Sequence, residues 1–172
     1  IITGAGGNPS LGRAHAMLLA SRGANVVVND IGSHPEMKNY PGTASAEAVA
    51  AEIRALGGKA VANTDSVAEQ PSAQRIVECA LDSFGSIDVL VNNAAISITV
   101  PFDEITPRDF QRHIDINLMG GVWTSYAAWP HMKKAGYGRI VNITSSSMTG
   151  FSDQAAYGTS KGGLWSLTRS LA

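Results

Sequence analysis

A tyrosine and a lysine four residues apart, Tyr157 and Lys161, are the side chains whose types and spacing most directly suggest chemistry. The run around them, residues 154–172, carries apolar residues at offsets of three and four, which predicts an amphipathic helix. On a helix, positions i and i+4 project from the same face, so the phenol and the ammonium would be neighbours. A cation favours the phenolate, and a phenol in that setting can exchange a proton with an alcohol or a carbonyl. The pair predicts acid–base chemistry, although an exposed helix face could carry the same two residues by chance.

A glycine-rich turn near the start of the chain predicts a phosphate-binding site. Ile1–Ile2 is apolar like the end of a buried strand, residues 3–12 are rich in glycine, and apolar residues then recur at helical spacing to about Arg22. In such a strand–turn–helix unit, glycines let the backbone approach a pyrophosphate and the helix N-terminus presents free N–H groups. Ser10 suits the N-cap position of that helix.

Asp30 indicates which dinucleotide the turn would hold. It ends a β-branched run, residues 26–30, that is typical of a parallel strand buried on both faces. It follows Gly12 by 18 residues, close to the roughly 20 expected for an acid that binds the adenosine ribose hydroxyls. A carboxylate there would repel the 2′-phosphate of NADP, and neither Ile31 nor Gly32 offers a compensating arginine. The sequence therefore favours NAD(H) over NADP, although the same aspartate could simply begin a turn.

The remaining pattern is an alternation of strands and helices. We predict further strands at 59–64, 88–91 and 139–144, helices near 49–56, 76–84 and 107–135, and a long loop at 31–44. This rhythm is typical of an α/β fold with a doubly wound parallel sheet in three α/β/α layers. The 172 residues suit one domain that spans residues 1–172.

Composition and charge argue against several other classes of protein. With 13 basic and 14 acidic residues and a net charge of −1, the chain lacks the basic stripe of a nucleic-acid-binding protein. No apolar run reaches about 20 residues, so we expect no membrane segment. The one cysteine, Cys79, favours a reducing compartment, the cytoplasm. The serines at 145–147 lack the glycine elbow of a hydrolase. We expect no metal site, because metal-ligand spacing is missing from the histidines: His15, His34, His113 and His131.

Several motifs follow one another along the chain: Thr3-Gly4 with the following glycines, Asp30, Asp65-Ser66-Val67, Asn92-Asn93-Ala94-Ala95, Asn117, Ser145, and Tyr157 with Lys161. With these motifs in this order, the sequence resembles the short-chain dehydrogenase/reductase family over essentially its whole length. Residues 23–30 and 57–67 are similar to its NAD-dependent (3R)-hydroxyacyl-thioester dehydrogenases and, more loosely, to 3-oxoacyl-carrier-protein reductases. The resemblance implies a Rossmann fold and an NAD(H)-dependent oxidoreductase that acts on a small-molecule secondary alcohol or ketone.

The resemblance implies a role for each matching residue. Tyr157 would be the general acid/base, and Lys161 would favour its phenolate and hold the nicotinamide ribose. Ser145 would hydrogen-bond the substrate oxygen, and Asn117 would hold a water that links Lys161 to solvent. Ser145 lies 12 residues before Tyr157, a shorter spacing than the family's usual one, and Ser146 is the fallback. The implied cofactor-binding residues are Gly4, Ser10, Leu11, Gly12, Asp30, Asp65, Ser66, Val67, Asn92, Ala94, Tyr157 and Lys161.

The glycine-rich turn departs from the family pattern. Five residues separate Gly4 from Ser10, and Ser10-Leu11-Gly12 stands where Gly-x-Gly is usual. This turn is similar to that of enoyl-acyl-carrier-protein reductases in the same superfamily, which space their tyrosine and lysine differently. An enoyl-thioester reductase therefore stays an alternative, as do a non-catalytic NAD(H)-binding scaffold and an NAD(H)-responsive regulator.

The two ends of the chain suggest a truncated protein. The sequence begins at Ile1 and stops at Ala172, within or just after the Tyr157 helix, whereas family members continue into further strands and a mobile segment over the substrate. We therefore expect the substrate-binding part to be incomplete. In the resemblance, the helices that carry Asn117 and Tyr157 form the main subunit contact, so a homodimer or homotetramer is expected.

Overall fold

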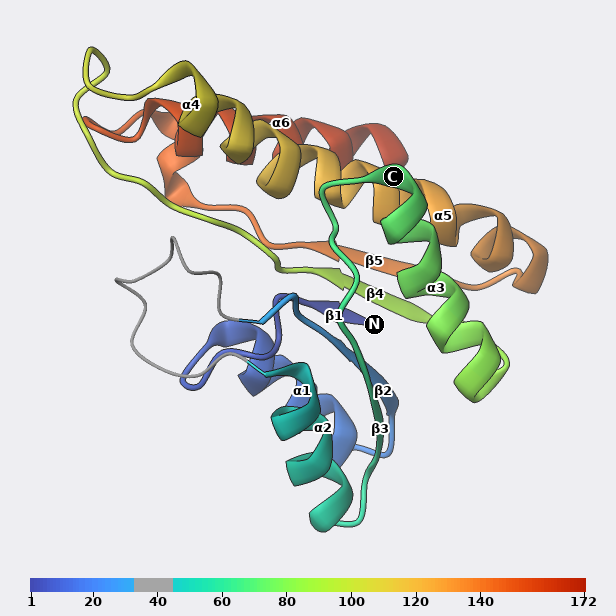
Figure 1. Ribbon diagram of the computed structural model, residues 1–172. Helices are drawn as coiled ribbons and strands as arrows, with labels where there is room; N and C mark the ends of the chain where they lie inside the picture. The colour runs from blue at the N-terminus through green and yellow to red at the C-terminus, as the bar shows by residue number, and fades with distance from the viewer. Residues whose placement is uncertain (33–44) are drawn as a thin grey trace.

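Five parallel strands form the sheet at the centre of the molecule (Figure 1). The computed structural model describes residues 1–32 and 45–172. In these residues the strands pair in the order β3-β2-β1-β4-β5, and every neighbouring pair is parallel. The strands are β1 (Ile2–Thr3), β2 (Asn25–Asn29), β3 (Lys59–Asn63), β4 (Val89–Asn92) and β5 (Arg139–Asn142).

Helices connect the strands, and their bounds follow from capping residues. Ser10, Ser45 and Thr106 each precede a helix and accept a backbone N–H from its first turn. Gly85 and Gly136 follow two helices with the left-handed backbone that ends a helix. The helices are α1 (Leu11–Ser21), α2 (Ala46–Ala55), α3 (Gln70–Phe84), α4 (Pro107–His113), the π-helix η1 (Ile114–Met119), α5 (Gly120–Ala135), the 3₁₀ helix η2 (Ser146–Thr149) and α6 (Ala155–Leu171).

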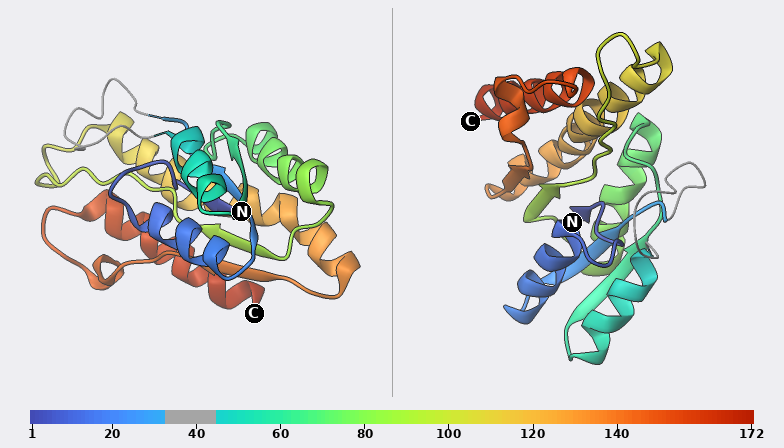
Figure 2. Two further views of the ribbon diagram at one scale, coloured as in Figure 1. Left: turned by 90° about the horizontal axis from the view of Figure 1, so that it is seen from below. Right: turned by 90° about the vertical axis from the view of Figure 1, so that its left-hand side faces the viewer.

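The sheet separates two hydrophobic cores, because successive residues of a strand face opposite sides. Helices α1 and α2 cover one face, and α3 and α5 cover the other, as the right-hand view of Figure 2 shows. Val26 and Val28 of β2 pack toward α1 and α2, whereas Val27 packs toward α3 and α5. Burial on both faces explains the continuous apolar run of β2.

Helices α4, η1 and α5 follow one another as a single rod. The sequence predicts helix over 107–135, and the structure has helix throughout that range. It also has a π turn at Ile114–Met119 that the apolar pattern does not indicate. π turns inside helices occur frequently at functional sites, and this one carries Asn117.

The strand order confirms the predicted doubly wound α/β sheet. From β1 the chain adds β2 and then β3 on one side, and afterwards adds β4 and β5 on the other side of β1. The order of the strands therefore reverses between β1 and β4, and ligands of such sheets bind outside the carboxyl ends of the strands at that switch point. The predicted strands and helices all occur, with ends shifted by a few residues. Apart from Ile31 and Gly32, the predicted loop at 31–44 lies outside the described residues, and so does His34.

Candidate functional site at the carboxyl edge of the sheet

The glycine-rich turn leaves β1 at the switch point and is fastened to the end of β4. The Thr3 hydroxyl accepts the backbone N–H groups of Asn93 and Ala94, each at 3.0 Å. In return, the Asn93 side chain donates to the carbonyls of Thr3 and Gly4, each at 2.9 Å. Gly4 has φ of +63°, and a Cβ there would lie 2.7 Å from the Ala94 Cα. Only glycine fits this conformation and this approach.

The start of α1 fits an anion. Ser10 caps the helix by accepting the N–H of Arg13 at 3.1 Å, which leaves the N–H groups of Leu11 and Gly12 without a partner among the described residues. The first turn contains no acidic residue, and Leu11 is 65% exposed. A Cβ on Gly12 would lie 2.4 Å from the Gly4 carbonyl oxygen, so the helix packs directly on the turn. Two free N–H groups and the helix dipole are the elements of a phosphate site.

Asp30 follows β2, and its carboxylate holds the glycine-rich turn. One of its carboxylate oxygens accepts the Gly6 N–H at 2.8 Å, and the other accepts the Gly32 N–H at 2.9 Å. Each carboxylate oxygen has a second lone pair, so the group can still accept hydrogen bonds from a ligand. A Cβ on Gly6 would lie 2.8 Å from the Asp30 Cβ. The backbone N–H groups of Gly6 and Gly32 thus fix the position of the carboxylate, which in turn holds the glycine-rich turn.

The segment after β3 is tied to α3. The Asp65 carboxylate pairs with the Arg75 Nε at 2.6 Å and accepts the Asn63 side chain at 2.9 Å. The Ser66 hydroxyl accepts the N–H of Ala68 at 3.2 Å. Val67 is buried among the residues that pack on α3 and α5. Part of the hydrogen-bonding capacity of Asp65 is therefore used within the protein, a pairing that the sequence reasoning missed.

Asn92 ends β4 with its side chain turned away from the glycine-rich turn. Its amide donates to Asn142 at 2.8 Å and to Ser125 at 3.1 Å, and its amide oxygen accepts the Thr124 hydroxyl at 2.6 Å. This buried network joins β4, β5 and α5. The backbone of Ala94, two residues after Asn92, lies against the glycine-rich turn.

Tyr157 and Lys161 lie on α6 one turn apart, as the spacing predicts. The Lys161 Nζ is 5.6 Å from the centre of the Tyr157 ring. Lys161 is 2% exposed and donates to the Ile143 carbonyl at 2.7 Å, just beyond the end of β5. Burial lowers the pKa of this ammonium from 10.5 to about 8. An almost fully buried lysine with one carbonyl acceptor is costly, so its position beside a half-buried tyrosine makes this pair a candidate functional site.

Asn117 connects the rod to α6 and to the loop after β4. Its side-chain oxygen accepts the Ile96 N–H at 2.8 Å, and its side-chain nitrogen donates to the Ile96 carbonyl at 2.9 Å. The same nitrogen lies 3.1 Å from the Ser160 hydroxyl, which itself donates to the Tyr157 carbonyl at 2.7 Å. Asn117 is 2% exposed. The π turn therefore places an amide between the loop and the helix that carries Tyr157.

Ser145 is the N-cap of the short helix η2, against which α6 packs. Its hydroxyl donates to the Ser147 hydroxyl at 3.0 Å and accepts the Ser147 N–H at 3.2 Å. Ser147 in turn donates to the Gln154 side chain at 2.5 Å. A Cβ on Gly158 would lie 2.6 Å from the Ser147 carbonyl oxygen. Ser145 therefore lies in the loop that follows Ile143, the acceptor of Lys161.

Several residues of the site carried no sequence signal that would assign them a role. Thr3 and Asn93 belong to the family motifs but had no predicted role of their own, yet their side chains join the glycine-rich turn to β4. Ser160 and Gln154 link Asn117 and Ser147 to α6. These contacts join residues far apart in the chain or depend on rotamers, so spacing alone does not indicate them.

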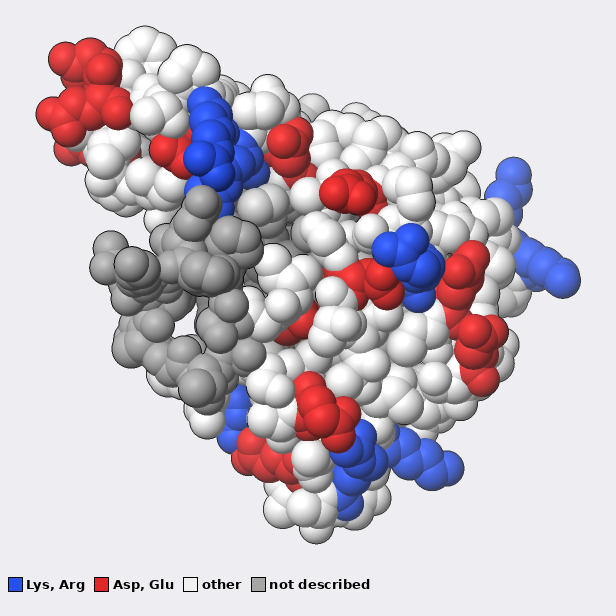
Figure 3. Space-filling model, in the orientation of Figure 1, with Lys and Arg blue, Asp and Glu red and all other residues white. Residues whose placement is uncertain are grey.

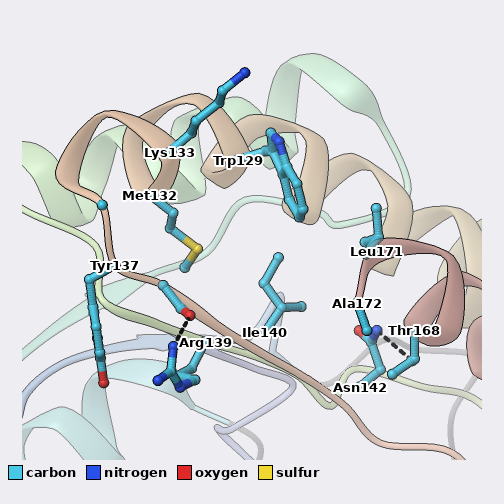
Figure 4. A pocket seen from close by; sticks show the side chains of 12 residues that line it. Trp129, Met132, Lys133, Tyr137, Arg139, Ile140, Asn142, Thr168, Leu171 and Ala172 are labelled. Carbon is cyan, nitrogen blue, oxygen red and sulfur yellow. Dashed lines mark hydrogen bonds between the residues drawn. The ribbon is translucent and has the colours of Figure 1, made fainter.

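A hollow of about 610 Å³ lies apart from this site, beside β5 and the ends of α5 and α6 (Figure 4). Trp129 and Met132 point toward Ile140 across it, whereas Lys133 points away (Figure 4). Among the described residues, none with a predicted catalytic or cofactor role lines it. We therefore place the candidate site at the switch point and not in this hollow.

The described parts of the chain contain neither a metal-binding cluster nor a helix that could span a membrane. Residues 1–32 and 45–172 contain no group of three or more His, Cys, Asp or Glu side chains that could hold a metal ion. No helix within those ranges has the length and apolar character needed to cross a membrane. On the face seen in Figure 3, outside the grey residues, basic and acidic side chains are interspersed and form no continuous basic band.

Comparison with known proteins places this geometry in a family. The model of the short chain dehydrogenase family matches residues 1–172. The chain is 44% identical to the peroxisomal hydratase-dehydrogenase-epimerase of Saccharomyces cerevisiae, covering all of this chain and 19% of that protein. It is 38% identical to a 3-oxoacyl-[acyl-carrier-protein] reductase of Synechocystis, covering all of this chain and 66% of that protein.

A solved structure supports the same placement. A short chain dehydrogenase from Mycobacterium avium superposes with a TM-score of 0.86 at 38% identity, covering 97% of this chain and 59% of that one. The chain thus spans less than two thirds of the length of each of these relatives. With the family's motifs in order, its fold and a match over every residue, this chain belongs to the short-chain dehydrogenase/reductase family.

Proposed function

We propose that the protein is an oxidoreductase that transfers a hydride between NAD(H) and a secondary alcohol or ketone, with Tyr157 as general acid/base. One observation supports this proposal above the others. Lys161, although 2% exposed, is held beside Tyr157 at the carboxyl edge of the sheet. The free N–H groups at the start of α1 lie along the same edge. An acid–base pair and a phosphate site at one sheet edge suit a dinucleotide-dependent reaction.

The residues present fit a nicotinamide dinucleotide. The N–H groups of Leu11 and Gly12 would bind the pyrophosphate, and the Asp30 carboxylate would accept the adenosine ribose hydroxyls. Asp65, Ser66 and Val67 would border the adenine, with the backbone of Asn92 and Ala94 nearby. The Asp30 carboxylate favours NAD over NADP, because it would repel a 2′-phosphate. Bound NAD(H) would supply or accept the hydride, which no protein side chain can do.

The catalytic side chains would move and stabilise the accompanying proton. Tyr157 would give its hydroxyl proton to the carbonyl oxygen in reduction, or take the alcohol proton in oxidation. The Lys161 ammonium would stabilise the phenolate by its charge and donate to the nicotinamide ribose. Ser145 would donate to the substrate oxygen as negative charge develops there. Asn117 would hold a water that links Lys161 to solvent, so that the proton given or taken by Tyr157 is exchanged with solvent along this relay.

The names of the relatives suggest a substrate class. The yeast relative is called a hydratase-dehydrogenase-epimerase and the Synechocystis relative a 3-oxoacyl-[acyl-carrier-protein] reductase. We therefore propose 3-hydroxyacyl or 3-oxoacyl thioesters as the first substrates to test. A homodimer or homotetramer formed through α5 and α6 also stays a prediction, and so does a cytoplasmic location.

Fluorescence titration with NADH, and separately with NADPH, tests the cofactor assignment. Tighter binding of NADH is the expected result, since Asp30 accepts ribose hydroxyls and repels a 2′-phosphate. Tighter binding of NADPH would show that Asp30 does not select the cofactor. Failure to bind either dinucleotide would remove the proposed hydride transfer altogether.

A further inference from the structure

The loop after β4 is held at every second residue. The N–H of Ile96 donates to the Asn117 side chain at 2.8 Å, that of Ile98 to His113 Nε2 at 3.0 Å, and that of Val100 to the Asp153 carbonyl at 3.0 Å. In an extended chain, alternate N–H groups point to the same side. Residues 96–100 therefore form a strap with one edge fastened to the protein.

The ends of this strap are tied to residues on either side of Tyr157. Ile96 is joined through Asn117 to Ser160, which follows the tyrosine. Val100 is joined to Asp153, which precedes it. The strap therefore runs alongside the first turn of α6. Ile98 lies midway between the two ties, and its holder is His113.

Within the strap, exposure alternates with the hydrogen bonds. Ile96 is buried and Ile98 half-buried, whereas Ser97 and Thr99 between and after them are exposed. No hydrogen bond from the backbone of Ser97 or Thr99 occurs within the described residues. One edge of the strap is therefore open, with two hydroxyl side chains beside it.

His113 is fully buried, at 0% exposed, and both its ring nitrogens have backbone partners. Nδ1 lies 2.7 Å from the Asp109 carbonyl oxygen, which can only accept, so Nδ1 carries the proton. Nε2 accepts the Ile98 N–H at 3.0 Å and is therefore unprotonated. These two partners fix one neutral tautomer of the imidazole. His113 lies four residues before Asn117, one turn along the same rod, so both hold the strap from one side.

We propose that His113 is a positioning residue for catalysis. This role rests on the proposed function. The Nδ1–H tautomer of His113 holds Ile98, and Ser97 and Thr99 on either side of it thereby form a fixed wall of the substrate site beside Tyr157. His113 touches neither substrate nor cofactor. It acts through Ile98, as Asn117 acts on Ile96, and it sets the distance between the wall and the phenol.

Two substitutions of His113 separate its hydrogen bonds from its volume. His113→Phe keeps an aromatic ring and removes both bonds. His113→Gln keeps an amide oxygen that can accept the Ile98 N–H and an amide nitrogen that can donate to the Asp109 carbonyl. The control is His131→Phe, the same chemical change at a half-buried position on α5, roughly 27 Å further along the rod at about 1.5 Å per residue.

The readouts are kcat and KM for the alcohol or ketone, the NADH dissociation constant, and the hydrogen-exchange rate of the Ile98 amide. We expect His113→Phe to lower kcat/KM by roughly 10- to 100-fold, the scale of a small misplacement of reacting groups. NADH binding should be unchanged, because the glycine-rich turn is held by other residues. The Ile98 amide should exchange faster in His113→Phe. His113→Gln should restore most of the turnover and the slow exchange, and His131→Phe should resemble the wild type.

The opposite results would overturn the inference in distinct ways. Wild-type turnover in His113→Phe would show that the wall needs no such support. A parallel loss of NADH binding and turnover would indicate a general structural role. Equal loss in His113→Gln and His113→Phe would exclude the hydrogen bonds as the cause. A wild-type protein that binds NADH and turns over no alcohol or ketone would instead refute the proposed function. In that case an Ile98 exchange rate unaffected by His113→Phe would also refute the hold of His113 on the strap.

Discussion

Replacing Lys161 by methionine should make the folded protein more stable while it removes the proposed activity. Lys161 is 2% exposed, and burial lowers the pKa of its ammonium from 10.5 to about 8. The charged form is therefore disfavoured in the fold by roughly 3 kcal/mol near neutral pH. Methionine has a similar length, is flexible and carries no charge. The Lys161→Met substitution leaves the Ile143 carbonyl without the hydrogen bond from lysine, which costs about 1 kcal/mol of stability. The net expectation is a gain of roughly 2 kcal/mol in the free energy of unfolding.

The pH dependence gives the same prediction a second form. Between pH 8 and pH 10.5 the folded protein releases the Lys161 proton while the unfolded chain keeps it. Because the unfolded state then binds more protons, the Lys161 contribution makes the wild type more stable as pH rises through this window. Below pH 8 both states hold the proton and the cost is constant. The stability advantage of Lys161→Met should therefore be full near neutral pH and shrink through the window.

Urea unfolding followed by circular dichroism, at about pH 7 and about pH 10, measures both effects. Lys134→Met is the matched control, because Lys134 is an exposed lysine near the end of α5. It should change stability by less than about 0.5 kcal/mol at either pH. A Lys161→Met variant that is less stable than the wild type near neutral pH would refute the argument. So would a stability difference that stays constant between the two pH values.

Four further substitutions test other parts of the structure. Asp30→Ala should weaken NADH binding and relax discrimination against NADPH, as fluorescence titration would show; an unchanged preference would contradict the ribose assignment. Gly12→Ala should destabilise the fold by about 1–3 kcal/mol through overpacking, because its Cβ would meet a backbone carbonyl oxygen at 2.4 Å. Gly162→Ala, whose Cβ would find its nearest neighbour at 3.9 Å, should instead stabilise α6 by roughly 0.5–1 kcal/mol. If Gly12→Ala and Gly162→Ala changed the thermal unfolding temperature alike, the close packing of Gly12 on the glycine-rich turn would be contradicted. Ser145→Ala should lower kcat by roughly 10²-fold without changing NADH binding, as expected for a lost oxyanion donor; an unaltered kcat would move that role to another residue.

The fold could be predicted because each element carries a local signal. The β-branched run of β2 reflects burial on both faces, and Ser10 caps α1 where the glycine-rich turn ends. The order of strands then follows from the handedness of their connections. Tyr157 and Lys161 could be paired because helical spacing alone puts them on one face.

The rest of the site depends on contacts that no local pattern contains. Thr3 and Asn93 are 90 residues apart, and their hydrogen bonds exist only once β1 and β4 lie side by side. The π turn around Asn117 has apolar residues that would suit an ordinary helix equally well. His113 lacks metal-ligand spacing in the sequence, and the proposed role rests on its two backbone partners, Ile98 and Asp109. Irregular helices and side chain–backbone bonds are set by tertiary packing, which the sequence pattern does not show.

Turnover by the wild type and by Tyr157→Phe tests the central claim most directly. The assay follows NADH absorbance with a panel of secondary alcohols and ketones that includes 3-hydroxyacyl and 3-oxoacyl thioesters, after NADH titration has shown that both proteins bind the cofactor. Because the substitution removes one hydroxyl and keeps the ring, we expect turnover to fall by roughly 10²- to 10⁴-fold with NADH binding intact. A Tyr157→Phe protein that keeps a rate close to that of the wild type would contradict the assignment of Tyr157 as the general acid/base.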